Sequence, residues 1–258
     1  MQDFNYHTHT YRCGHASGSD EEYILAAIKA GYKTLGFADH APYKDYPLPS
    51  SHMDISMFDE YVDSISILKE KYKDQIDIKV GLESEYYKAN HDERVMLHDR
   101  LDYLILGQHF LDPEPSVSFF KNNSEEEILE YGRLVCEALD TGLFMYLAHP
   151  DVFMSKQENF TKACVDVARM IASKCVDLDI PVELNVHNVR KGKHLISNKE
   201  EYFYPNKSFW TIMSEYPIKV LLGVDAHKPE DLLDFDAIEK SLNEVSDLNL
   251  NFITKPLI

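Results

Sequence analysis

Hydrophobic and polar positions alternate in two different rhythms along the chain. At residues 76–82 apolar and polar side chains alternate one by one, which is the period of a β-strand with one buried face. Tyr61, Ile65 and Leu68 instead recur every three or four positions, which is typical of an amphipathic helix. The two rhythms take turns seven times, so we expect strands to alternate with helices.

The pattern also locates these elements. Strands are expected at about 4–6, 34–38, 76–82, 103–107, 143–148, 181–185 and 218–224. Helices are expected at about 20–30, 59–72, 91–100, 125–139, 160–176, 207–216 and 229–245. Ser19 or Asp20 is a suitable cap for the first helix. Ser124 to Glu127 resemble a capping box before the fourth helix.

Alternating strands and helices favour parallel pairing through right-handed crossovers. Because no linker or change in composition separates the seven units, we expect one α/β domain with a closed or nearly closed barrel. The periodicity alone does not separate seven strands from eight, or a barrel from an open sheet. Residues 41–56, with three prolines, are a candidate lid or specificity loop. The tail at 248–258 could pack on the barrel or on a second subunit.

Composition narrows the class of protein. The chain has 258 residues, of which 44% are hydrophobic and 27% charged, as in an ordinary globular domain. The formal net charge of −18 argues against nucleic acid or an anionic membrane as a partner. Without a signal-peptide pattern or a membrane-length apolar run, a cytoplasmic protein is expected. The four cysteines lack CxxC spacing and are expected to be reduced, and Cys13 alone could approach a metal.

Imidazoles and carboxylates follow nearly every predicted strand. His7 and His9 would face the same side of the first strand, and His15 could turn back from the loop. The carboxyl ends of barrel strands meet on one face, so these side chains are expected to converge and bind several metal ions. The candidate residues at these strand ends are His7, His9, His15, Asp39, His40, Glu83, His109, His149, Asp225 and His227.

A ligand set rich in histidine suits zinc, iron(II) or manganese better than magnesium or calcium. Neighbouring ions need a bridging ligand, for which Glu83 is the natural candidate and Glu85 a rival. No lysine ends these strands, which argues against a carbamylated-lysine bridge. The histidines in predicted loops and helices are expected to be solvated, namely His52, His91, His98 and His194.

Six short motifs carry these residues: HTHT at 7–10 followed by His15, ADH at 38–40, GLE at 81–83, GQH at 107–109, AHP at 148–150 and GVDAH at 223–227. Together they resemble the polymerase-and-histidinol-phosphatase (PHP) superfamily, and within it the monofunctional histidinol-phosphatase branch. The resemblance extends over nearly the whole chain. It implies a distorted (β/α)7 TIM-like barrel and a single metallophosphoesterase domain over residues 1–258.

The resemblance also implies three divalent metal ions. It assigns the first ion to His7, His9, Glu83 and Asp225. It assigns the second ion to Glu83, His109 and His149, with Glu83 as the bridge. The third ion would be bound by His15, His40 and His227. Every one of these positions holds the residue type that the family pattern requires.

The resemblance implies that the protein hydrolyses a small phosphomonoester. The favoured substrate is L-histidinol phosphate, whose hydrolysis is a step of histidine biosynthesis. A hydroxide that bridges two ions would attack phosphorus in line, in a catalytic centre that includes Asp225 and His227. Asp39 would be a hydrogen-bonded partner of a ligand, which we favour, or an acid near the leaving group.

Substrate recognition calls for a different set of residues. The planar fork of arginine matches phosphate, so Arg190 is the first candidate and Arg12 the second. His187 could contact the substrate or be an ordinary loop residue. The sequence does not identify the residues around the histidinol part or the oligomeric state.

Two other functions remain open from the sequence. The protein could be a PHP-type phosphoesterase for another small phosphate ester or a nucleotide. It could also be a metal-binding module without turnover, although a complete ligand set argues against a module that has lost its activity.

Overall fold

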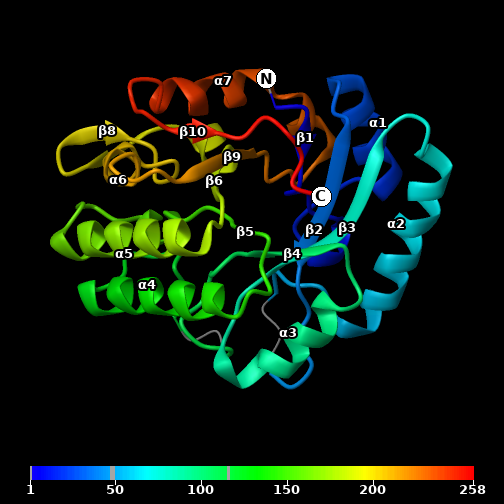
Figure 1. Cartoon of the computed structure of the whole chain (residues 1–258), viewed down its shortest axis with the longest axis horizontal. Coiled ribbons are helices and arrows are strands. Elements are labelled where there is room, and N and C mark those ends of the chain that lie inside the picture. Colours follow the sequence, from blue (N-terminus) through cyan, green and yellow to red (C-terminus); the bar gives the residue numbers. More distant parts are fainter. Residues whose placement is uncertain (1, 47–49, 115–116) are drawn as a thin grey trace.

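The computed structural model describes residues 2–46, 50–114 and 117–258. Its main sheet contains eight parallel strands and curls, with helices along its outer side (Figure 1). In sheet order the strands are β1 (Phe4–Asn5), β2 (Thr34–His40), β3 (Asp77–Ser84), β4 (Tyr103–Leu106), β5 (Tyr146–Leu147), β6 (Val182–Asn185), β9 (Lys219–Gly223) and β10 (Asn251–Phe252). The first seven of these correspond to the seven predicted strands, which confirms the predicted α/β barrel.

The curled sheet closes between β1 and β9, beside the histidine-rich segment. Thr8 and Ala226 form a parallel bridge, in which the backbone N–H of His9 donates to the carbonyl of Ala226 at 2.9 Å. Nearer the amino ends of the strands, side-chain amides replace the missing backbone bonds. Asn5 accepts from the backbone N–H of Val224 at 2.9 Å, and Gln2 bonds both backbone groups of a β9 residue. The barrel is therefore distorted along this seam.

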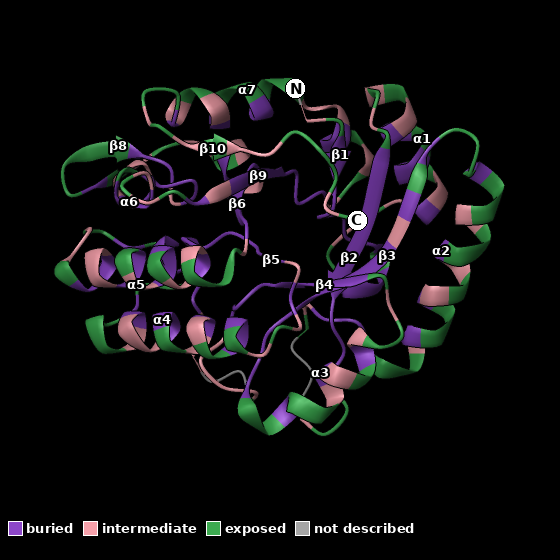
Figure 2. Ribbon diagram, viewed as in Figure 1, coloured by how far each residue is buried: buried purple, intermediate pink, exposed green. Residues whose placement is uncertain are grey.

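Seven α-helices surround the sheet, with exposed residues on their outward faces and the strands buried behind them (Figure 2). They are α1 (Asp20–Ala30), α2 (Phe58–Tyr72), α3 (His91–His98), α4 (Glu125–Asp140), α5 (Lys162–Leu178), α6 (Lys207–Met213) and α7 (Phe235–Glu244). The predicted caps are confirmed, because Ser19 and Ser124 each form a capping box with the glutamate three residues later. The short 3-10 helices are η1 (Tyr11–Cys13), η2 (Ile55–Met57), η3 (Lys88–Asn90), η4 (Val152–Met154), η5 (His187–Lys191) and η6 (Pro229–Leu233).

Some predicted elements are shorter or divided. The predicted helix at 229–245 breaks into η6 and α7, because Asp234 leaves the helical conformation and its side chain caps α7 at the N–H of Ala237. The antiparallel hairpin of β7 (His194–Ile196) and β8 (Lys199–Glu201) was not predicted. Its turn at Ser197 and Asn198 has positive φ angles of 49° and 63°, and such short strands carry little periodic signal.

The tail packs on the barrel, as one of its two sequence interpretations proposed. After β10, Ile253 and Leu257 pack against the apolar residues inside the barrel. The backbone N–H groups of Leu257 and Ile258 donate to the hydroxyl of Tyr6 at 3.1 and 3.3 Å. Within the described ranges, no helix has both the length and the apolar character needed to cross a membrane.

Replacing Asn5 tests the role of the seam. The Asn5→Leu variant would leave the buried N–H of Val224 without a partner and would remove the hydrogen bonds that the Asn5 amide donates to the His7 carbonyl and the Thr8 hydroxyl. We expect it to lower the free energy of unfolding by about 3 kcal/mol in urea titrations. Gln2→Leu is the control and should cost about 1 kcal/mol, since Gln2 is only partly buried and water can replace it. Equal losses in both variants would contradict this account of the seam.

Candidate metal centre

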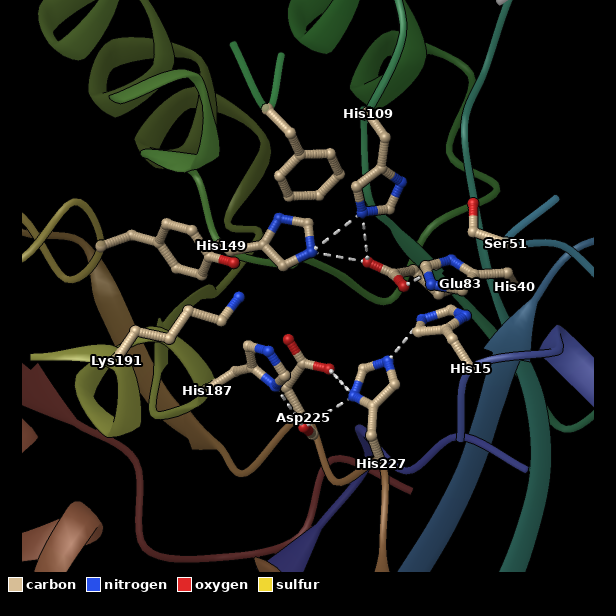
Figure 3. A pocket seen from close by; sticks show the side chains of 12 residues that line it. His15, His40, Ser51, Glu83, His109, His149, His187, Lys191, Asp225 and His227 are labelled. Atoms are coloured by element: carbon tan, nitrogen blue, oxygen red, sulfur yellow. Dashed lines mark hydrogen bonds and ion pairs between the residues drawn. The ribbon is translucent and has the colours of Figure 1, made fainter. Parts of the chain in front are cut away.

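The carboxyl ends of the barrel strands bring all nine predicted metal ligands together around a cavity of about 240 Å³. Most of them line it, and they point toward one another (Figure 3). The cavity is lined by His15, His40, Ser51, Glu83, His109, Phe120, His149, His187, Lys191, Tyr204, Asp225 and His227. His7 and His9 lie directly beneath it and are fully buried.

Glu83 lies at the centre of the cluster. Its Oε1 atom is 2.7 Å from Nε2 of His149 and 3.3 Å from Nε2 of His109. Its Oε2 atom is 3.4 Å from Nε2 of His7 and 3.5 Å from Nε2 of His9. The two oxygens of one carboxylate thus face two separate pairs of imidazoles, which is the arrangement that a bridging ligand needs.

Asp225 completes the group around His7 and His9. Its Oδ1 atom is 3.1 Å from Nε2 of His9 and 3.6 Å from Nε2 of His7. Ligands about 2.1 Å from a tetrahedral ion lie about 3.4 Å from one another, so this spacing suits one metal ion. Asp225 has a positive φ of 50°, a conformation that costs free energy in a non-glycine residue and is frequent at functional sites.

The remaining imidazoles form a third group at the mouth of the cavity. Nε2 of His15 and Nε2 of His227 are 2.9 Å apart, and the ring of His40 stacks on that of His15. His40 also points its Nδ1 atom toward Oε2 of Glu83 at 3.1 Å. It therefore lies between two groups, and its assignment to the third ion stays a prediction.

The donor atoms in this cluster fit divalent metal ions. Nε2 of His7, both ring nitrogens of His9, Oε2 of Glu83 and Oδ1 of Asp225 are buried without a hydrogen-bond partner. Leaving so many buried polar atoms unpaired is costly, and one bound cation could satisfy several of them at once. Combinations of three such atoms lie within 4.8 Å of one another, including those of His7, His9 and Glu83.

Charge divides the imidazoles into two kinds in the absence of metal. Burial opposes protonation of His9, but the carboxylates of Asp225 and Asp39 outweigh it and raise its pKa to about 9. Burial likewise opposes protonation of His109, where Glu83 and its neighbours raise the pKa to about 10. In the third group burial prevails and lowers the pKa of each imidazole, at His15, His40 and His227.

Carboxylates behind the ligands fix the imidazole orientations. Glu183 on β6 accepts from Nδ1 of His7 at 2.8 Å, which leaves Nε2 for a metal. A Cβ atom at Gly223 would lie 2.1 Å from the carboxyl of Glu183, so only glycine fits there. Glu183 was not among the residues predicted from the sequence. Its alternation with Val182 and Leu184 on β6 was the signal that could have placed it inside the barrel.

Asp39 is also behind a ligand and away from the cavity. Its Oδ1 atom is 3.5 Å from Nδ1 of His9, its Oδ2 accepts from the hydroxyl of Thr10, and its side chain is fully buried. This position fits the favoured partner role. It corrects the alternative of an acid beside the leaving group, because Asp39 does not line the cavity.

Neither arginine proposed for phosphate lies at the cavity, which corrects that prediction. Arg12 is buried, forms a double hydrogen bond to Asp20 at 2.9 Å and pairs with Glu60. Arg190 donates to Asp234 at 3.1 Å and to two backbone carbonyls. The next residue, Lys191, lines the cavity instead, because adjacent residues of η5 face different directions.

His187 does line the cavity, as one of its two sequence interpretations proposed. Its Nδ1–H donates to the backbone carbonyl of Asp225 at 3.2 Å, and its ring lies edge-on to His227. Its contact with substrate stays a prediction. Cys13 is not among the residues that line the cavity, and its thiol donates to the carbonyl of Thr10, but its sulfur lies within 4.8 Å of ligand atoms of His9 and Asp39, so its approach to a metal stays a prediction.

Two further expectations are wrong. His52 was expected to be solvated but is only 4% exposed, and its Nε2 lies 3.0 Å from a carboxylate oxygen of Glu85. Glu85 was a rival for the bridging role. It instead accepts from Nδ1 of His109 at 2.7 Å, on the side of that ring away from Glu83. The loop that carries His52 has no periodic pattern from which its burial could be predicted.

A curled α/β barrel with imidazoles and carboxylates at its strand ends defines a class of metal-binding barrel proteins. The PHP domain family model matches residues 5–187. The chain belongs to this family, which confirms the resemblance seen in the motifs.

Several relatives of the chain are named as histidinol-phosphatases. The chain is 26% identical over 260 residues to a probable histidinol-phosphatase of Deinococcus radiodurans, and the match covers 95% of each protein. It is 34% identical to the histidinol-phosphatase of Bacillus subtilis over 126 residues, a match that covers 45% of this chain and 47% of that protein. The fold is shared with the histidinol phosphate phosphatase of Lactococcus lactis solved with zinc, L-histidinol and phosphate. That comparison has a TM-score of 0.74 at 16% identity, over 98% of this chain and 95% of the other.

Metal binding is expected to release protons. At pH 7 the raised pKa values keep His9 and His109 protonated in metal-stripped protein, so an incoming ion must displace these protons. Apparent affinity should therefore rise with pH until it passes about 9 to 10. Calorimetric titration with Mn²⁺ in buffers of different ionisation enthalpy should show more protons released at pH 7 than at pH 9.

The control is His98→Gln, at an exposed histidine outside the cluster, which should release as many protons as the unmodified protein. Metal binding at pH 7 without proton release would show that the imidazoles are neutral before the metal arrives.

Proposed function

We propose that this protein is a metal-dependent histidinol-phosphatase, which hydrolyses L-histidinol phosphate to L-histidinol and phosphate. The observation that carries the proposal is the convergence of nine ligating side chains on one small cavity. Membership of the PHP family and the histidinol-phosphatase names of the relatives support this reaction. A cavity of about 240 Å³ suits a small phosphomonoester, and the net charge of −18 disfavours nucleic acid.

Three divalent ions, of zinc, manganese or iron, are proposed for the cluster. His7, His9, Glu83 and Asp225 would hold the first, Glu83, His109 and His149 the second, and His15, His40 and His227 the third. When bound, such ions supply positive charge for the phosphoryl oxygens and lower the pKa of water. Carboxylates behind the ligands, Glu183 at His7 and Glu85 at His109, keep the Nε2 atoms of these two imidazoles directed inward.

Other side chains around the cavity would bind the substrate itself. Lys191 is exposed and is the only lysine or arginine among the cavity's described lining residues, so we assign it to the phosphate. Phe120 and Tyr204 supply aromatic surface for the ring of the leaving alcohol. His187, held by its Nδ1 to the carbonyl of Asp225, would present its other nitrogen to the ester.

The first test is phosphate release from L-histidinol phosphate beside sugar phosphates, nucleotides and an aryl phosphate. We expect kcat/KM for histidinol phosphate to exceed the others by at least about 100-fold, a discrimination of about 2.7 kcal/mol. Activity should disappear on chelation and return with manganese, zinc or iron. Comparable weak activity on every ester would instead indicate another substrate, and metal binding without any turnover would indicate a non-catalytic module.

Removing the proposed phosphate cation gives a second test. Lys191→Ala should raise KM about tenfold while metal content stays unchanged, because only a contact with the substrate is lost. Lys193→Ala is the matched control, since that lysine pairs with Glu244 at 2.7 Å instead of lining the cavity. An unchanged KM in Lys191→Ala would remove this residue from the phosphate site.

A further inference from the structure

Glu85 joins the metal centre to a loop. One oxygen of its carboxylate accepts from Nδ1 of His109 at 2.7 Å, and Nε2 of His52 lies 3.0 and 3.1 Å from the two oxygens. The hydroxyl of Tyr43 donates to the same carboxylate at 2.9 Å. Glu85 is completely buried, so its charge is balanced by these groups and not by water.

His52 is buried and contacts several neighbouring groups, although it comes from the long loop at 41–56. Its ring stacks on that of His40 with a centroid distance of 4.9 Å and an interplanar angle of 28°. Next to it, the backbone N–H of Met53 donates to the carbonyl of His40. The ring therefore lies against one proposed ligand and, through Glu85, is connected to another, His109.

The second ring nitrogen of His52 connects to the cavity wall. Nδ1 lies 3.2 Å from the hydroxyl of Ser51, and Ser51 lines the cavity. Figure 3 shows Ser51 beside His40 and Glu83. The imidazole of His52 thus contacts Glu85, which hydrogen-bonds the proposed ligand His109, through one nitrogen. Through the other nitrogen it contacts the hydroxyl of Ser51, which lines the cavity.

We propose that His52 is a positioning residue that acts in two directions. Through Glu85 it keeps Nε2 of His109 directed at the metal centre, and through Nδ1 it fixes the hydroxyl of Ser51 at the substrate cavity. Ser51 and His52, near the end of the long loop, are then a part of the site. The effect on substrate binding rests on the proposed function, whereas the effect on metal retention does not.

The experiment separates the two directions with three variants. His52→Ala removes both contacts and should weaken retention of one metal ion about 10- to 100-fold and also raise KM. His52→Gln keeps an N–H that can reach Glu85 but offers nothing to Ser51. It should retain metal within about threefold of the unmodified protein and show the raised KM. Ser51→Ala should leave metal retention unchanged and raise KM by the same factor as His52→Gln.

Metal retention is measured by elemental analysis after dialysis against a competing chelator, and KM with L-histidinol phosphate. His98→Gln serves as the control for an exposed histidine. The proposal is overturned if His52→Ala folds and its metal retention and KM equal those of the unmodified protein. A lower unfolding temperature as the sole change would overturn it too. If His52→Ala does not fold, the pair of His52→Gln and Ser51→Ala decides, and an unchanged KM in both overturns it.

The result stays interpretable if histidinol phosphate is not the substrate. In that case the unmodified protein releases little phosphate from L-histidinol phosphate. Metal retention in the His52 variants still supports or overturns the link between His52 and His109. KM is then compared with the aryl phosphate that the protein hydrolyses.

Discussion

The closed seam between β1 and β9 is the constraint on which the metal centre depends. Two proposed ligands at the start of the chain, His7 and His9, lie more than two hundred residues from Asp225 in the sequence. The bridge between Thr8 and Ala226 places them side by side, because the backbone groups of His7 and His9 form its hydrogen bonds to Ala226, the residue next to Asp225. An open sheet of the same strands would leave the ligand set divided between two edges.

Closure also concentrates charge where water is excluded. Glu83, Asp225 and Glu183 are buried together, and such carboxylates are tolerated only where cations or hydrogen bonds compensate them. Without metal, protonated imidazoles compensate part of this negative charge, and the pKa values of His9 and His109 are raised for that reason. Metal ions would replace these protons, so the same charges that stabilise protonated histidines also favour metal binding.

The proposed substrate contacts come from a different set of residues than the proposed metal ligands. The strands hold the ligands rigidly, whereas Ser51, Phe120 and Lys191 reach the cavity from loops and from η5. Sites on a rigid scaffold commonly divide in this way, with the reaction centre on regular elements and the substrate contacts on connections. A histidine such as His52, anchored to Glu85, lets a connecting loop share some of that rigidity.

Strand and helix order, the barrel class and the convergence of nine candidate ligands could be predicted from the sequence, because they are carried by local periodicity and by residues at or near predicted strand ends. His7, Glu83 and Asp225 each follow an apolar run, and parallel strands must bring such ends together. Directions and partners could not be predicted in this way. Arg190 and Lys191 are neighbours, yet only the fold decides which one faces Asp234 and which the cavity. The burial of His52 likewise depends on a carboxylate 33 residues away, and such long-range pairing leaves no periodic trace in the chain.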